Sequence, residues 1–164
     1  MTDMSARFAL PFILPGQAQK EVFHNEALAA IDAALHPSVE EIADAPPGAP
    51  GAGESWIVDD GASGAWSGKA QMLATWTSGG WRFVAPVPGM TAWDRSAGLW
   101  RYWTGAAWSD GAWPAAAIRI GGQQVLGPRL AEVPNPTGGA TVDAEARAAI
   151  DALIATLKSH GLTD

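Results

Sequence analysis

The sequence predicts an α+β protein in which a small tryptophan-rich β domain lies between two helices. Apolar residues recur at helical spacing near each end, and short apolar segments separated by glycine fill the centre. Five of the nine tryptophans fall between residues 79 and 108. Short strands divided by turn residues are typical of an antiparallel β-meander. We therefore expect an arm and helix over 1–41, a meander or barrel-like domain over 42–133, and a loop with a C-terminal amphipathic helix over 134–164.

The N-terminal region is predicted to be an extended arm followed by a helix. Two prolines interrupt residues 1–15, and Pro37 ends the helix. The helix carries an apolar stripe at spacings of three and four, made of His24, Leu28, Ile31 and Leu35. Four arm residues are too apolar for a free tail, and we expect them to dock on the same chain or on an adjacent protein: Phe8, Phe12, Ile13 and Leu14.

The central region contains short segments of strand length, and each break between them holds Gly, Asp or Ser. The segments lie at 55–60, 64–76, 79–86, 89–103 and 105–113. A tryptophan follows a glycine turn at Trp66, Trp81, Trp108 and Trp113, which we interpret as hairpins whose outgoing strand begins with Trp. Residues 117–133 are expected to add one or two strands.

The C-terminal region is predicted to be a helix that begins after Thr141, a suitable N-cap, and ends at Gly161. An isolated helix of this length is marginally stable in water. Its apolar stripe is therefore expected to pack against symmetry mates in a homo-oligomer, a trimer or pentamer. The oligomerisation residues are Ile150, Leu153, Ile154 and Leu157.

Composition excludes several classes of function. A net charge of −7, with ten scattered Lys and Arg residues, gives no electrostatic footprint for nucleic acid. No apolar stretch is long enough to insert in a membrane, and the N-terminus does not resemble a secretory signal. The absence of Cys removes thiol chemistry and thiolate metal sites. Charged residues make up 16%, below the roughly 25% of ordinary globular proteins, which favours a component of an assembly.

No motif in the sequence points to catalysis, a cofactor or a metal. The three histidines lack carboxylates at metal-ligand spacing. A cell-wall hydrolase would need an exposed carboxylate pair, such as Asp59 with Asp60 or Asp94 with Asp110. Aspartate beside Gly or Ser in a hairpin is more typical of turns. We therefore expect that the protein is not an enzyme.

The tryptophans have three possible roles: a core, a stacking platform for sugar, or a subunit contact. In residues 99–103, strand alternation places Trp100 and Tyr102 on one face and Trp103 on the other. Sugar rings stack on exposed aromatic faces while polar side chains fix their hydroxyls. The set with that mixture is Trp93, Asp94, Arg95, Trp100 and Trp103. Two or three coplanar exposed rings would favour the sugar platform.

The block RFALPFILPGQAQKEVFHNEALAAIDA (7–33) resembles the opening of a domain-of-unknown-function family found in tailed phages and gene transfer agents. Further pieces match at 53–58, 64–68 and 80–93, and the ending from Gly121 resembles a tail of the same particle proteins. Within the block, Asn25 and Glu26 lie early in the predicted helix, where they can bond the arm or a neighbouring strand.

The resemblance implies a virion protein of a phage-like particle, made in the bacterial cytoplasm and part of a head spike or tail fibre that attaches the particle to the host surface or capsule. Its partners would be other copies of itself and other spike, fibre or capsid proteins. The alternative function is a carbohydrate-binding module that contacts a bacterial capsular polysaccharide directly.

Overall fold

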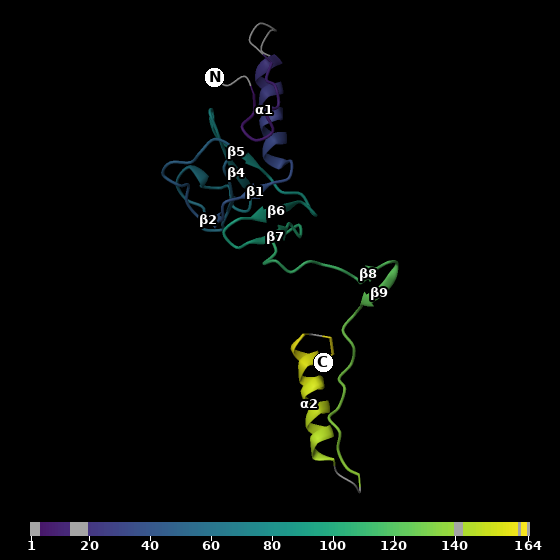
Figure 1. Cartoon of the computed structure of the whole chain (residues 1–164). Coiled ribbons are helices and arrows are strands. Elements are labelled where there is room, and N and C mark those ends of the chain that lie inside the picture. Colours follow the sequence, from purple (N-terminus) through teal and green to yellow (C-terminus); the bar gives the residue numbers. More distant parts are fainter. Residues whose placement is uncertain (1–3, 14–19, 140–142, 161, 164) are drawn as a thin grey trace. The chain divides into compact units, whose positions relative to one another are not determined.

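The computed structural model describes residues 4–13, 20–139, 143–160 and 162–163. The chain divides into two units, residues 1–113 and 114–164 (Figure 1). The first unit holds helix α1 (Lys20–Ala34) and strands β1 to β7, and the second holds β8, β9 and helix α2 (Ala144–Ser159). The predicted α+β class, with a helix near each end and β structure between them, is confirmed. The three domain boundaries drawn from the sequence stay a prediction.

Seven strands of the first unit form two sheets. The three-stranded sheet has the order β1-β6-β7, with bounds Ser38–Val39, Thr91–Asp94 and Leu99–Tyr102. The four-stranded sheet has the order β2-β3-β4-β5, with bounds Ile42–Ala43, Ser55–Val58, Leu73–Thr77 and Gly80–Val84. The β1–β6 and β2–β3 pairs are parallel. The sheets are therefore mixed and form no closed barrel, which corrects the expectation of a purely antiparallel, barrel-like domain.

Both faces of the four-stranded sheet are buried over its central strands. Alternation along β3 and β4 sends Ile57 and Leu73 to one face, where they pack with Val39 and Ala92 of the three-stranded sheet. The other face carries Trp56, Val58 and Ala74, which pack around Trp66. The domain thus has two apolar clusters with the four-stranded sheet between them.

Trp81 lies at the centre of a group of four tryptophans, three of which belong to the second cluster. Its ring lies 5.6 Å from Trp56, 5.1 Å from Trp66 and 5.0 Å from Trp76, each edge to face. Such contacts contribute about 0.5–1.5 kcal/mol each beyond the burial of the rings. Trp66 lies in a 3₁₀ turn, η1 (Gly64–Trp66), rather than at the start of a strand, which corrects the hairpin expected there. The glycine–tryptophan step at Trp81 does begin a strand, β5.

Helix α1 contacts β4 and β5 through a different face from the one predicted. Asp32 and Ala33 are buried, whereas Ile31 and Leu35 of the expected apolar stripe are exposed. The spacing of the stripe did not identify the inward face, because it left out Asp32. Here the polar side chain of Asp32 is buried because it has hydrogen-bond partners in the arm.

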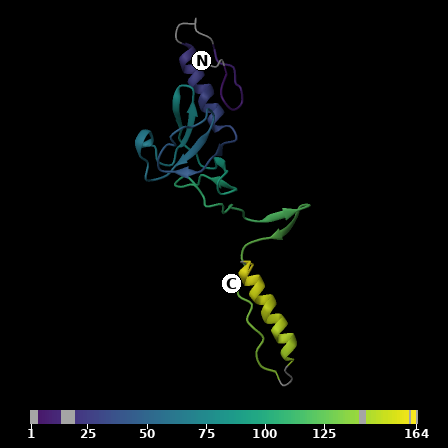
Figure 2. The ribbon, with the colours of Figure 1, turned by 60° about the vertical axis from the view of Figure 1, so that its left-hand side comes forward.

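In the second unit, an extended segment lies along α2. Strands β8 (Ile118–Ile120) and β9 (Gln123–Leu126) form a hairpin, and residues 129–138, called here the strap, then run beside the helix in both ribbon views (Figures 1 and 2). Arg147 donates to the carbonyls of Pro136 and Gly138, and Lys158 pairs with Glu132 at 2.6 Å. Neither α1 nor α2, the helices of the described residues, is long and apolar enough to cross a membrane.

The N-cap of α2 is Asp143, whose carboxylate accepts a hydrogen bond of 2.8 Å from the amide of Ala146. The residue expected in this role was Thr141, which lies outside the described residues. Both residue types satisfy the free amides of a first turn, and Asp143 does so two residues later in the sequence. The helix therefore begins later than predicted.

Candidate functional site

The arm is attached to α1 through one buried carboxylate. Asp32 accepts hydrogen bonds from the Ser5 hydroxyl at 2.7 Å, from the Arg7 amide at 2.9 Å and from the Phe8 amide at 2.6 Å. Gly53 lies under the arm, and a Cβ there would come within 3.1 Å of Arg7 Cγ and 3.2 Å of Ala6 Cβ. The arm is thus fixed by an acceptor that satisfies three donors at once.

The guanidinium of Arg7 caps the C-terminus of α1. It donates to the carbonyl oxygens of Asp32 at 2.6 Å and His36 at 2.7 Å, and to those of Ala33 and Leu35 at 3.2 Å. The last carbonyls of a helix lack intrahelical partners, and a cation is favourable at this end of the helix dipole. Burial lowers the pKa of Arg7, and the charge of Asp32 opposes that shift.

None of the described apolar arm residues chosen from the sequence is fully buried. Phe8 is exposed, with the Arg7 guanidinium 5.1 Å from its ring centroid, while Phe12 and Ile13 are half-buried. Leu14 lies outside the described residues. Sequence reasoning missed Ser5, Arg7 and Asp32, because a network between residues so far apart leaves no local pattern.

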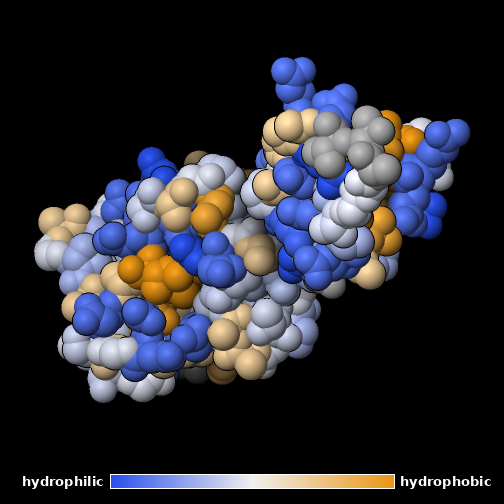
Figure 3. Space-filling model, turned by 90° about the horizontal axis from the view of Figure 1, so that it is seen from below, coloured by the Kyte–Doolittle hydropathy of each residue, from blue (hydrophilic) through white to orange (hydrophobic). Residues whose placement is uncertain are grey.

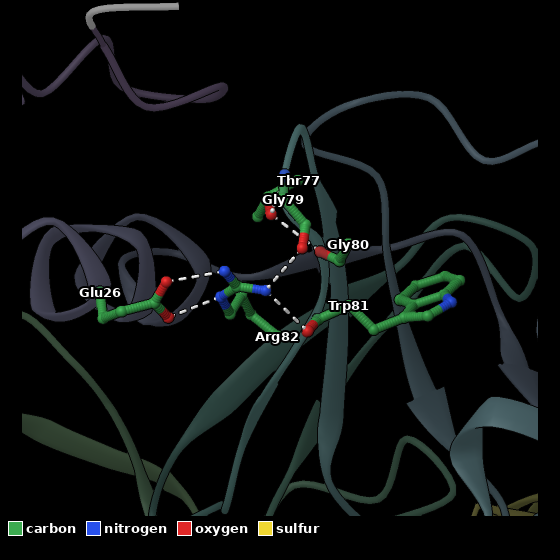
Figure 4. A network of polar contacts seen from close by, with 6 residues as sticks. All are labelled: Glu26, Thr77, Gly79, Gly80, Trp81 and Arg82. Carbon is green, nitrogen blue, oxygen red and sulfur yellow. Dashed lines mark hydrogen bonds and ion pairs between the residues drawn. The ribbon is translucent and has the colours of Figure 1, made fainter. Parts of the chain in front are cut away.

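Asn25 bonds the arm, and Glu26 bonds a strand, which confirms the expectation for this pair. The Asn25 side chain accepts from the Ile13 amide at 2.9 Å and donates to the Ile13 carbonyl at 3.1 Å. Glu26 forms a two-pronged ion pair with Arg82 of β5, at 2.6 and 2.7 Å (Figure 4). Arg82 also donates to the carbonyls of Gly79 and Trp81, and the hydrogen bond to Glu26 raises its pKa.

A cavity of about 510 Å³ lies between the arm, α1 and the β4–β5 hairpin. Met4, Phe12 and Ala29 line it together with Thr75 and Thr77. Its acidic neighbours Glu26 and Asp32 are both engaged in hydrogen bonds, and none of the described lining residues is a histidine. Through these hydrogen bonds the polar side chains around the cavity join the arm, the helix and the sheet.

Trp93 and Trp100 are the two members of the predicted sugar set that share an outward face. They are directly opposite in the β6–β7 register, with ring centroids 5.4 Å apart and planes at 67°. Trp100 is 47% exposed and Trp93 is half-buried. The rings are therefore adjacent but not coplanar, so this pair does not make the flat platform that was the criterion for sugar stacking.

Asp94 is buried at 1% exposure and points into the domain. It accepts from Arg101 at 2.7 Å, from the Ala97 amide at 3.0 Å and from the Ser96 hydroxyl at 3.1 Å. Burial alone would raise the pKa of Asp94, but the bonds from Ala97, Arg101 and Ser96 together outweigh it and hold the pKa below its usual value. Its carboxylate is committed to the β6–β7 turn and is not at the surface.

Arg95 and Trp103 also lie away from the outward pair. Arg95 is in the turn after β6 and bonds Glu40 at 2.6 Å. Trp103 is buried, with its ring 5.7 Å from that of Trp108. Trp108 in turn donates its indole N–H to the Gln71 carbonyl at 2.9 Å. Strand alternation had already placed Trp103 on the face opposite Trp100, and the structure bears this out.

Two further aromatic residues extend the outward face of β6 and β7. Tyr102 lies on the same face as Trp100, and the ring of Trp113 meets it edge to face at 5.8 Å. Trp113 is 58% exposed, and with Trp100 and Thr91 it lines a hollow of about 340 Å³. Alternation in the sequence indicated Tyr102. The glycine turn before Trp113 predicted that it begins a strand, but Trp113 lies between β7 and β8 and belongs to neither strand.

The predicted oligomerisation stripe on α2 is largely exposed. Leu153 is 65% exposed, and Ile150 and Leu157 are exposed as well. Ile154 is instead buried at 6%, because it shares a helix side with Arg147 and Lys158, which bind the strap. Ile154 is therefore removed from the exposed stripe. Apolar patches also interrupt the hydrophilic surface seen from below (Figure 3).

One family model matches the chain over residues 24–109, from within α1 to just beyond β7. The chain belongs to the DUF2793 family, proteins of unknown function. The DUF2793 match spans all seven strands of the first unit, and the arm and the second unit lie outside it. No curated protein matches the chain. Among the described residues, no group of three or more His, Asp or Glu side chains is placed to hold a metal ion.

Proposed function

We propose that the protein is a structural, homo-oligomeric component of a phage-like particle, a phage or gene transfer agent, within a head spike or tail fibre that attaches the particle to its host. The motifs in residues 7–33 support the particle assignment through their resemblance to particle proteins. The exposed stripe of α2 carries the oligomeric part of the proposal.

The second unit has too little core of its own. Over residues 114–139, 143–160 and 162–163, the only buried residues are Ile154 and Thr163. Small domains of this size usually need a well-packed core, metals, disulfides or partners to remain folded. Ala146, Ile150, Leu153 and Leu157 recur at spacings of four, three and four, which is the pattern of a helix that packs against other helices.

Association through this stripe would bury three large apolar side chains per copy. Each such side chain contributes about 1.5–3 kcal/mol when it is fully buried. The small residue Ala146 allows the helices to approach closely at the first turn of α2. Several copies would then present several first units on one particle, which strengthens weak contacts with a surface.

The experiment compares the full-length protein with Leu153→Asp by size-exclusion chromatography with light scattering. We expect a trimer or pentamer for the unchanged protein and a monomer for Leu153→Asp. Ala155→Asp is the matched control, because Ala155 is exposed on the other side of the same helix. All nine tryptophans lie in residues 56–113, so unchanged tryptophan fluorescence shows that the first unit is intact.

A monomeric unchanged protein at tens of micromolar would overturn the oligomeric part. The particle assignment has its own test: an epitope-tagged chain should co-purify with particles through a density gradient and appear in a particle map. Its absence from purified particles would overturn that part alone.

Direct carbohydrate binding is the second candidate function. The outward aromatic face of β6 and β7 favours it, because exposed Trp100 and Trp113 serve no core cluster. Under this alternative the same first unit would contact capsular polysaccharide directly rather than support a separate receptor-binding protein.

A further inference from the structure

The hollow between Trp100 and Trp113 lies on the outside of the three-stranded sheet. Alternation along β6 buries Ala92 and Asp94, so Thr91 and Trp93 face outward. The antiparallel register then places Tyr102 opposite Thr91 and Trp100 opposite Trp93. This face lies opposite the apolar cluster that Val39, Ile57, Leu73 and Ala92 form between the sheets.

Each of the two exposed rings is held by a second aromatic ring. The Trp100 ring meets Trp93 at 67°, and the Trp113 ring meets Tyr102 at 65°. Edge-to-face contacts of this kind are favourable, and they restrict the rotation of the exposed ring. A ligand that enters the hollow therefore meets walls that are already ordered, which lowers the entropy cost of binding.

The lining residues indicate the chemical class of the ligand. It consists of two aromatic side chains and one hydroxyl, and none of the lining residues is charged. A pyranose ring presents polarised C–H groups on a face and hydroxyls around its rim, which match the electron-rich ring faces and the Thr91 hydroxyl. An anionic ligand would find no cation here and a chain of net charge −7.

The size of the hollow separates a sugar from a protein partner. At about 340 Å³ it lies at the lower end of the roughly 300–1,000 Å³ typical of small-molecule sites. A stable protein interface instead covers about 800 Å² on each partner. A volume of this size suits one ring-sized unit of a polymer.

We propose that this hollow binds a neutral hexose unit of a bacterial surface polysaccharide, stacked on Trp100 and Trp113 and hydrogen-bonded to Thr91. The inference rests on the attachment role proposed above and identifies the surface of the protein that would contact the host polysaccharide. It replaces Asp94 and Trp103 of the sequence-based set, which are buried, with Thr91 and Trp113.

The experiment measures binding of the full-length protein to an array of neutral and acidic bacterial capsular and O-antigen polysaccharides. We expect binding to at least one neutral polymer. Trp100→Ala and Trp113→Ala should each weaken the apparent affinity by about tenfold, because each removes one stacking wall and multivalency enlarges the loss. Thr91→Val, which keeps the shape of the side chain, should weaken it less.

Phe23→Ala is the control, since Phe23 is an exposed aromatic residue on α1, away from the hollow. It should bind as the unchanged protein does. Near-ultraviolet circular dichroism confirms that each variant keeps its tryptophan packing.

Three outcomes overturn the inference. In the first, the unchanged protein binds no neutral polymer at all, and in the second, both tryptophan variants bind as tightly as the unchanged protein does. The third outcome is dissociation of the oligomer by Trp100→Ala, which would make the hollow a contact between copies. Light scattering on the same samples separates this result from the proposed function. An oligomer that binds no polymer contradicts only the hollow, and a monomer that binds contradicts only the oligomer.

Discussion

The ion pair between Asp94 and Arg101 stabilises the β6–β7 turn from inside. Asp94 is fully enclosed, and three donors compensate for the burial of its charge. Removal of the charge would leave Arg101, itself mostly buried, without its carboxylate. Loss of one member of such a pair costs more than the pair contributes when it is intact.

Asp94→Asn should therefore destabilise the domain by about 2–3 kcal/mol at neutral pH. Because the folded-state pKa of Asp94 is below the unfolded value near 4, its contribution is complete above that pH and disappears as the pH falls below it. The difference in urea midpoint between the two proteins should shrink below pH 4. Asp110→Asn, in an exposed turn, should show no such difference. A constant difference from pH 7 to pH 3 would contradict this assignment.

At the scale of single elements, the arm and α1 are joined by reciprocal caps. Asp32 of the helix satisfies donors of the arm, and Arg7 of the arm satisfies carbonyls of the helix. Glu26 then ties the same helix to β5 through Arg82 (Figure 4). The helix thus connects the arm to the sheet by polar contacts on two of its sides.

Asp32→Ala should release the arm, because three donors lose their acceptor at once. Arg7 is a trypsin site, so the rate of cleavage after Arg7 should rise by about tenfold or more as the local free energy of opening falls. Intact-mass spectrometry during limited trypsin digestion measures this as loss of residues 1–7. Asp59→Ala, at an exposed loop residue, is the control. Equal cleavage rates would show that other contacts hold the arm.

Sequence patterns identified the elements whose signals are local. The two helices and the hairpins of β4–β5 and β6–β7 follow from spacing and from glycine turns. The two-residue strands β1 and β2 had no such signal, because each exists through a parallel partner elsewhere in the chain. The prediction of the inward face of α1 was wrong for a related reason. The burial of Asp32 depends on its hydrogen bonds with Ser5 and Arg7, and the periodicity of the helix carries no information about residues in the arm.

The residues of the candidate site were likewise predictable only where their signal is local. Alternation placed Trp100 and Tyr102 on one face and Trp103 on the other, as the structure has them. The burial of Asp94 was not predictable, because aspartate in a hairpin usually points to solvent and its partner Arg101 lies across the turn. Trp113 joins the face only because the chain returns to Tyr102 after the last strand.

At the scale of the whole chain, the two units differ in how they are stabilised. Both apolar clusters and all the tryptophans lie in residues 1–113, whereas the second unit buries one apolar residue among those described. The first unit should therefore fold without the second.

A protein of residues 1–113 should keep the near-ultraviolet circular dichroism of the full chain and unfold cooperatively. A shorter protein of residues 1–104 should not, because it lacks Trp108, which packs on the first cluster and bonds Gln71. Thermal unfolding followed by tryptophan fluorescence compares the two. An unfolded 1–113 protein would show that the first unit depends on residues 114–164.

The parallel pairing of β1 with β6 also has a consequence for synthesis on the ribosome. Ser38 pairs with Trp93, so the inner face of β3 and β4 stays uncovered until residues 91–103 have emerged. During that interval Ile57 and Leu73 face solvent. Closure of so long a loop makes folding slow compared with helix formation, on the order of milliseconds to seconds. The nascent chain is thus most prone to aggregation while its β6–β7 hairpin is still inside the exit tunnel.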